Sequence, residues 1–158
     1  MIENEEGQEF KTVTWANFGM FPGWVGVSSG YDYEELQAYF KKKRLFNRYG
    51  LVMKSHEEMF SRNNNGFAIY QEIQDTKTKE IEGLYFVVLR HPYDFSDEAY
   101  ITLAHELIHI VQFFAPTVFD RNTERESEAY LHTHLMRQCL AAFRLGKTGK
   151  TKFQKEQA

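Results

Sequence analysis

The 158-residue sequence predicts an α+β domain in which a small, mainly antiparallel sheet packs on two C-terminal helices. Strand-like and turn-like segments fill the first 30 residues and return at 67–90, whereas apolar residues recur at helical spacing after position 96. Hydrophobic residues make up 42% of the chain and charged residues 26%, as in a globular protein with one core. We therefore expect a single domain over residues 1–146 and a polar tail, disordered in our interpretation, over 147–158.

The first half of the chain contains one clear helix signal. "TWANFGMFPGWVGVSSG" at 14–30 mixes aromatic residues with Gly and Pro and indicates short strands and turns. Asp32 is placed to cap a helix whose apolar residues recur at helical spacing, namely Leu36, Tyr39, Phe40 and Phe46. "GLVMKSHEEMFSR" at 50–62 is ambiguous, and "NNNG" at 63–66 predicts a turn.

The second half predicts a hairpin followed by two helices. "FAIYQEIQ" and "EIEGLYFVVLR", separated by the polar "DTKTK", indicate two antiparallel strands. Pro92 ends the second strand, Ser96 or Asp97 can cap the next helix, and that helix is expected to stop before Pro116. Thr123 and Glu126 form a possible capping box for the last helix, which Gly146 is expected to end.

Charge and composition exclude several function classes. The net charge of −3 does not favour nucleic-acid binding, and no apolar run is long enough to cross a membrane. The basic run "KKKR" at 41–44 is interpreted first as a solvated helix end and second as a patch for a nucleic acid or another anion. A single cysteine and an acidic first segment indicate an intracellular, cytoplasmic protein. "GKTGKT" near the end lacks the spacing and the preceding strand of a phosphate-binding loop.

"LAHELIHIVQFF" at 103–114 carries the strongest chemical signal. Residues four apart stack on one face of a helix, so His105 and His109 can bind one Zn²⁺ through their ring nitrogens. Glu106 lies near enough to act as a general base on a water molecule that the metal activates. The opposite face of this helix is apolar, with Leu103, Leu107, Ile110 and Phe114.

A catalytic zinc ion needs a third protein ligand and an open fourth position. Glu128 is the favoured third ligand, because it lies on the apolar stripe of the last helix, where a carboxylate is costly unless it is compensated. That stripe continues through Leu131, Leu135, Cys139 and Ala142. Glu124 is the alternative, although the helix dipole alone explains an acid in the first turn, and Glu126 is better used in the capping box.

"HELIH" followed by a helix bearing "EAYLH" resembles the gluzincin clan of zinc metallopeptidases. The likeness covers about residues 80–145, and the short chain resembles small intracellular gluzincins such as the minigluzincins or the ImmA/IrrE-type peptidases. It implies a zincin-like fold, one Zn²⁺ per chain held by His105, His109 and Glu128, and Glu106 as general base in the hydrolysis of a peptide or protein substrate. The third histidine of metzincins and of SprT-type proteases is not evident, because position 113 is Phe.

His132 occupies the position where larger members of that clan often carry an Asp that orients a zinc-bound histidine. We expect it to donate to Glu128 or to hold a developing oxyanion, and the alternative is a half-buried helix histidine without a catalytic role. His134 is expected at the surface, and Gln112 could support His109. Further oxyanion candidates, each with an equally simple structural role, are Tyr130, Tyr100, Tyr93 and His91.

Two other expectations follow from the resemblance. The strand "GLYFVVLR" at 83–90 corresponds to the edge strand that binds an extended peptide in zincins, although its side chains equally suit a sheet core. An alternative function is a zinc-binding regulatory or interaction protein on the same fold, with restricted or no proteolytic turnover. The oligomeric state does not follow from the sequence.

Overall fold

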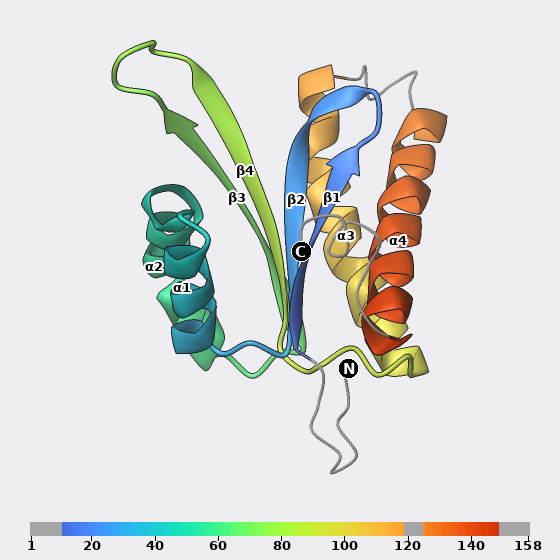
Figure 1. Ribbon diagram of the computed structural model, residues 1–158. Helices are drawn as coiled ribbons and strands as arrows, with labels where there is room; N and C mark the ends of the chain where they lie inside the picture. Colours follow the sequence, from blue (N-terminus) through green and yellow to red (C-terminus); the bar gives the residue numbers. More distant parts are fainter. Residues whose placement is uncertain (1–10, 119–124, 149–158) are drawn as a thin grey trace.

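The computed structural model describes residues 11–118 and 125–148 as a four-stranded sheet between two helical layers (Figure 1). The strands are β1 (Thr12–Phe18), β2 (Phe21–Ser29), β3 (Gly66–Gln74) and β4 (Ile81–Leu89), in the spatial order β1-β2-β4-β3. Both hairpins, β1–β2 and β3–β4, are antiparallel, as predicted for the second of them. The two central strands, β2 and β4, run parallel, so the α+β class is confirmed with a mixed sheet.

The described α-helices are α1 (Tyr33–Lys42), α2 (Leu51–Ser55), α3 (Asp97–Val118) and α4 (Arg125–Thr148). A π-helical turn at Phe46–Gly50 leads into α2, and a 3-10 turn at Glu57–Ser61 follows it. Figure 1 shows α1 and α2 on one face of the sheet and α3 and α4, antiparallel to each other, on the opposite face. None of the described helices combines the length and the apolar character needed to cross a membrane.

The sheet has an apolar cluster on each face, and this double burial explains the near-continuous apolar run of β4. Residues Tyr85 and Val87 of β4 pack toward α3 and α4. Their neighbours Phe86 and Val88 pack toward α1 and α2. Alternation along the strand therefore supplies both cores.

Two predicted helix caps are present. The Asp32 carboxylate accepts from the backbone N–H of Glu35 at 2.7 Å, and the Glu35 carboxylate accepts from the backbone N–H of Asp32, which completes a capping box. Ser96 caps α3, because its Oγ accepts from the N–H of Ala99 at 3.1 Å. Thr123, the predicted cap of the last helix, lies outside the described residues.

Two predicted helix ends are wrong. α3 continues through Pro116 to Val118, although Pro116 lacks the N–H that would bond the carbonyl of Gln112. Phe114 and Ala115 are buried just before the proline, so tertiary packing outweighs the lost hydrogen bond. α4 likewise continues through Gly146 to Thr148, because a glycine costs a helix only about 1 kcal/mol and Phe143 anchors this part of α4 by stacking on Tyr93.

Gly26 tests the register of the sheet, because a Cβ there would meet Phe86 at 2.4 Å and Trp15 at 2.8 Å. These residues are its register partners on β4 and β1. We expect Gly26→Ala to lower the free energy of unfolding by about 1–3 kcal/mol, measured by urea denaturation. The same substitution in a Phe86→Leu background should cost less; an equal cost in both backgrounds would contradict the close approach.

Cys139 tests the core between the sheet and α4. The residue is fully buried, and this burial raises the pKa of its thiol to about 12. The folded protein should therefore resist a thiol reagent such as DTNB at mildly alkaline pH, whereas urea-unfolded protein should react with one equivalent at once. Fast labelling of the folded protein would show that α4 does not pack Cys139 into the core against the sheet.

Candidate functional site

The two faces of α3 separate apolar residues from the histidines, as the sequence predicts. Leu103, Leu107, Ile110 and Phe114 are buried in the core between the sheet and α4. The His105 side chain is 65% exposed and His109 is half-buried. Burial of one face therefore holds the two imidazoles on the outer side of the helix.

The imidazoles of His105 and His109 converge on each other. Their Nε2 atoms lie 3.2 Å apart, with ring planes at 84°. Two nitrogen ligands of a tetrahedral zinc ion, each about 2.0–2.1 Å from the metal, would be separated by about 3.3 Å. The spacing of the two nitrogens thus fits two adjacent positions of a zinc coordination sphere.

Gln112 determines the tautomer of His109. Its Oε1 lies 3.1 Å from His109 Nδ1, and because an amide oxygen only accepts, Nδ1 carries the proton. In the neutral imidazole the Nε2 atom of His109 then carries the lone pair, which is the form that binds a metal, and without a metal it accepts from His105 Nε2. Metal binding would require His105 to move its proton to Nδ1, which is possible because its side chain is largely solvated.

Glu106 lies beneath this pair and beside the start of β3. Its exposed fraction is 6%, and its Oε1 lies 3.9 Å from His105 Nε2. Burial raises the pKa of the Glu106 carboxyl above its usual value, and the neighbouring His105 and His109 oppose this shift. A Cβ at Gly66 would lie 2.8 Å from the carbonyl oxygen of Val88 on β4, 3.2 Å from Thr102 Cγ2 and 3.5 Å from Glu106 Cγ, so the glycine avoids a clash within the sheet at the point where β3 contacts α3.

His132 contacts the backbone of α3. Its Nε2 donates to the carbonyl oxygen of Ala104 at 3.0 Å, immediately before His105. The structure therefore places this histidine between the two helices, half-buried, with its Nε2 directed at a helix carbonyl. This contact joins α4 to the part of α3 that carries His105 and His109.

Glu128 lies one helical turn before His132 on α4. α3 and α4 are antiparallel neighbours, and His132 contacts Ala104 (Figure 1). A residue one turn toward the start of α4 therefore lies at the level of a residue one turn toward the end of α3, so Glu128 lies near Ile108 and His109. Glu128 is half-buried, and its Oε1 is shielded from solvent. Nevertheless, no group of three or more His, Cys, Asp or Glu side chains within residues 11–118 and 125–148 is arranged to hold a metal ion.

The structure therefore brings together His105, His109 and Glu106 and leaves Glu128 on the neighbouring helix. Glu126 is exposed, and Glu124 lies outside the described residues. His134 is exposed as expected, with its Nε2 3.3 Å from Asn17 Oδ1. Among the oxyanion candidates, Tyr100, Tyr130 and His91 are exposed, whereas Tyr93 is buried against Phe143.

The strand at 83–90 is not an edge strand. β4 pairs with β2 on one side and with β3 on the other, because the β1–β2 hairpin covers the side that was expected to be open. β3 forms the edge of the sheet instead, and it contacts α3. An extended peptide added beside the histidines would thus pair with β3.

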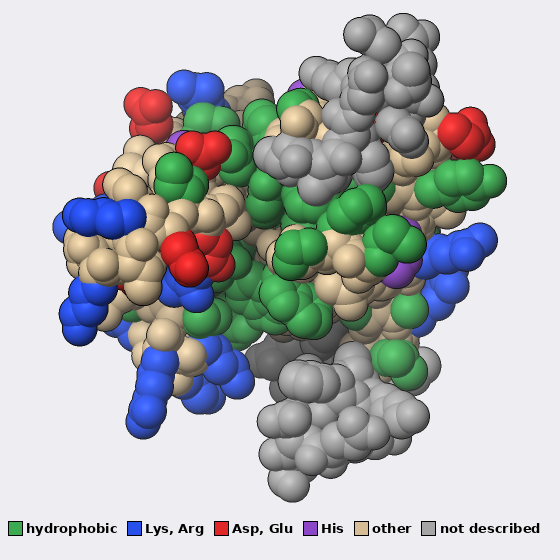
Figure 2. Space-filling view, turned by 90° about the horizontal axis from the view of Figure 1, so that it is seen from above, with side chains coloured by type: hydrophobic (Ala, Val, Ile, Leu, Met, Phe, Trp, Pro, Cys, Tyr) green, Lys and Arg blue, Asp and Glu red, His purple; other side chains and the backbone are tan. Residues whose placement is uncertain are grey.

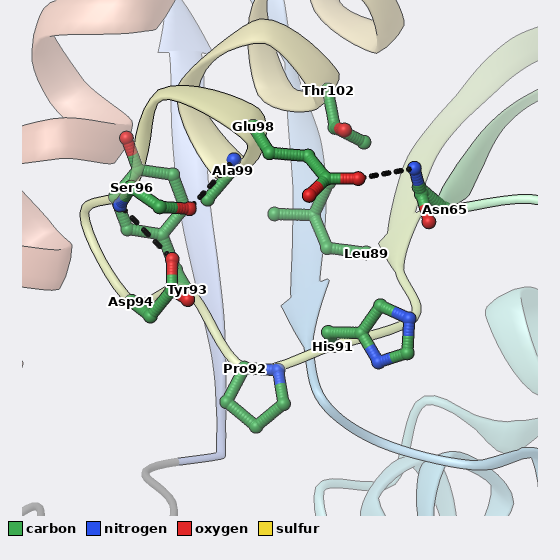
Figure 3. A pocket seen from close by; sticks show the side chains of 10 residues that line it. All are labelled: Asn65, Leu89, His91, Pro92, Tyr93, Asp94, Ser96, Glu98, Ala99 and Thr102. Atoms are coloured by element: carbon green, nitrogen blue, oxygen red, sulfur yellow. Dashed lines mark hydrogen bonds between the residues drawn. The ribbon is translucent and has the colours of Figure 1, made fainter.

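A pocket of about 320 Å³ lies between the start of α3 and the end of β4 (Figure 3). Asn65 donates to Glu98 across it at 3.3 Å, and Asp94 accepts from the backbone N–H of Ser96. Thr102 also lines the pocket, one helical turn before Glu106, so the pocket adjoins the histidine-bearing face. Sequence reasoning missed Gly66 and Thr102, and the glycine after "NNN" at the start of a strand was the only signal for this contact.

Comparisons of the chain with protein-family models, with curated proteins and with solved structures found no match.

His132 offers a test of how α4 is aligned on α3. Replacing it with Leu removes the donor to Ala104 and should lower the free energy of unfolding by about 0.5–1.5 kcal/mol. His132→Gln, which can still donate, should recover part of this loss, and Thr133→Ala at the exposed neighbouring position should change stability less. Denaturant unfolding measures all three variants; equal stability of the Leu variant and the parent would exclude a stabilising contact.

Proposed function

We propose that this chain is a zinc-dependent peptidase that hydrolyses peptide bonds in a peptide or protein substrate. The observation that carries the proposal is the 3.2 Å separation of His105 Nε2 and His109 Nε2 directly above the buried carboxyl of Glu106. The tautomer that Gln112 imposes on His109 supports it, because it leaves a nitrogen lone pair directed toward the pair's midpoint.

In this proposal His105, His109 and Glu128 hold one Zn²⁺. Glu128 belongs to α4 near the level of His109, and the proposal requires its side chain to turn toward the two histidines when the metal binds. Zinc, when bound, would polarise the scissile carbonyl and activate a water molecule. The zincin-like character of the fold remains part of the same proposal.

Glu106 is the proposed general base. Its carboxylate would accept the proton of the attacking water and return it to the amine of the leaving group. The carboxyl is buried and its Oε1 lies 3.9 Å from His105 Nε2, which supports a role beside a metal-bound water. His132, bonded to Ala104, would act as a positioning residue through α3.

The free edge of β3 would bind the substrate in an extended form. A peptide that adds to a sheet edge forms backbone hydrogen bonds with the edge strand. Its alternate side chains can then bind in pockets of the protein. The pocket that ends at Thr102 lies next to this edge and to Glu106, so one substrate side chain could enter it.

Metal content and activity test the proposal together. Elemental mass spectrometry should find about one zinc per chain, greatly reduced in His105→Ala and His109→Ala and weakened in Glu128→Gln. Glu106→Gln should keep the zinc and lose at least about two orders of magnitude in peptide cleavage, because only the proton acceptor is removed.

The exposed Glu126 provides the matched control for Glu128 on the same helix, and Glu126→Gln should leave both zinc content and cleavage unchanged. A parent protein that takes up no metal after zinc is offered and the excess removed would contradict the proposal. Zinc retained fully in Glu128→Gln would exclude Glu128 as the third ligand.

A second candidate function is a zinc-dependent interaction protein with little or no turnover. Ile101 and Ile108, which flank His105 along α3, are 64% and 44% exposed. This apolar surface suits contact with a partner protein. Among the described residues only the two histidines are arranged as metal ligands, which also fits a protein with little turnover. Cleavage of generic unfolded proteins that is lost in Glu106→Gln would exclude this alternative.

A further inference from the structure

The helical layer opposite the histidines carries concentrated positive charge. Between residues 36 and 56 the chain has no acidic residue and six cations, namely Lys41, Lys42, Lys43, Arg44, Arg48 and Lys54. The whole chain has a net charge of −3, so this charge is local. Figure 2 shows Lys and Arg side chains gathered on the side of the molecule that α1 and α2 form.

Most of these cations have no acidic partner within the described parts of the chain. Arg48 pairs with Glu82, whereas no ion pair involves Lys54 or any residue of the "KKKR" run. Lys41 instead holds its Nζ 5.1 Å from the centre of the Phe46 ring. These ammonium and guanidinium groups are therefore available to anions from another molecule.

A groove of about 450 Å³ runs between α1 and α2 among these cations. Its lining combines three apolar or aromatic residues with one amide and two of the cations; these residues are Tyr33, Ala38, Phe46, Gln37, Lys41 and Lys54. Glu34 also lines it and is its one acid. The groove thus combines apolar walls with positive charge.

Gln37 leaves an unsatisfied acceptor at this groove. The residue is 8% exposed, and its Nε2 donates to Tyr33 Oη at 3.0 Å and to the carbonyl of Gly50 at 2.9 Å. Its Oε1 is shielded from water and has no hydrogen bond to any described residue. A buried acceptor is costly when unpaired, so a donor group that enters between the helices would be favoured.

The aromatic residues of the groove do not suit nucleic-acid bases. Lys41 stands over the Phe46 ring, and Tyr33 packs edge-on against Phe60 while its hydroxyl binds Gln37. Base stacking on single strands requires an open aromatic face beside the basic groups. Apolar walls flanked by ammonium groups fit an acidic polypeptide with an apolar side chain better.

We propose that the groove between α1 and α2 binds an acidic peptide segment of a partner protein. Carboxylates of the segment pair with Lys41, Lys54 and the adjoining basic run, and an apolar side chain fills the space beside Ala38 and Phe46. A donor group of the segment satisfies Gln37 Oε1. The groove lies across the sheet from the histidines, so this inference does not depend on the proposed function.

Selection from a random-peptide phage library on the full chain tests the proposal. The enriched peptides should be acidic with an apolar residue, and a fluorescent copy of one should bind less tightly as salt rises. The Lys41→Gln, Lys54→Gln double variant should weaken its affinity by about tenfold, and Ala38→Glu should weaken it too, because both change the charge of the lining. Glu34→Gln should tighten binding.

Lys77→Gln, at an exposed lysine of the β3–β4 turn, is the matched charge control and should bind as the parent does. Circular dichroism and Tm should confirm that each variant is folded, since all substituted residues are exposed. Lys41 also lies over the Phe46 ring. The proposal is overturned if no acidic peptide is enriched, or if the selected peptide binds the double variant as tightly as the parent. A different ligand would also overturn it. That outcome is binding of oligo-dT or of phosphatidylserine vesicles that the double variant abolishes, with no binding of acidic peptides.

Discussion

The packing of α3 on the sheet is the constraint on which the rest of the candidate site depends. Leu103, Leu107, Ile110 and Phe114 are all nearly or fully buried, and burying each such side chain contributes about 1.5–3 kcal/mol. A rotation that buried the histidines would lose most of this free energy and would also desolvate two imidazoles. The helix therefore has one stable orientation, and in that orientation His105 and His109 face outward together.

The same orientation explains why Glu106 is buried, unlike the other Asp and Glu residues that the structure describes. It lies between the buried stripe and the outer face, next to Gly66 at the start of β3. α4 completes the layer by packing Leu135 and Cys139 into the core and by bonding His132 to Ala104. The sheet thus separates two independent surfaces, one with the paired histidines and one with the basic groove between α1 and α2.

Features with a local physical cause could be predicted from the sequence. The spacing of apolar residues predicted α3 and its faces, and Asp32 caps α1 as expected. The β3–β4 hairpin followed from β-branched and aromatic residues on both sides of a polar turn. Features set by distant contacts could not. The parallel pairing of β2 with β4 joins strands separated by the whole α1–β3 segment, and it removed β4 from the edge. The packing of Phe114 in the core likewise allows α3 to continue beyond Pro116. The histidine pair was predictable because its spacing is local, whereas the position of Glu128 depends on how two helices align.

X-ray absorption spectroscopy of the zinc-loaded chain would test the central claim most directly, because it reports which atoms surround the metal. The account predicts one ion bound by two imidazole nitrogens and by carboxylate and water oxygens at about 2.0–2.2 Å, with the carboxylate contribution lost in Glu128→Gln. A spectrum with imidazole ligands alone, unchanged in Glu128→Gln, would contradict the proposed union of α3 and α4 in one metal site.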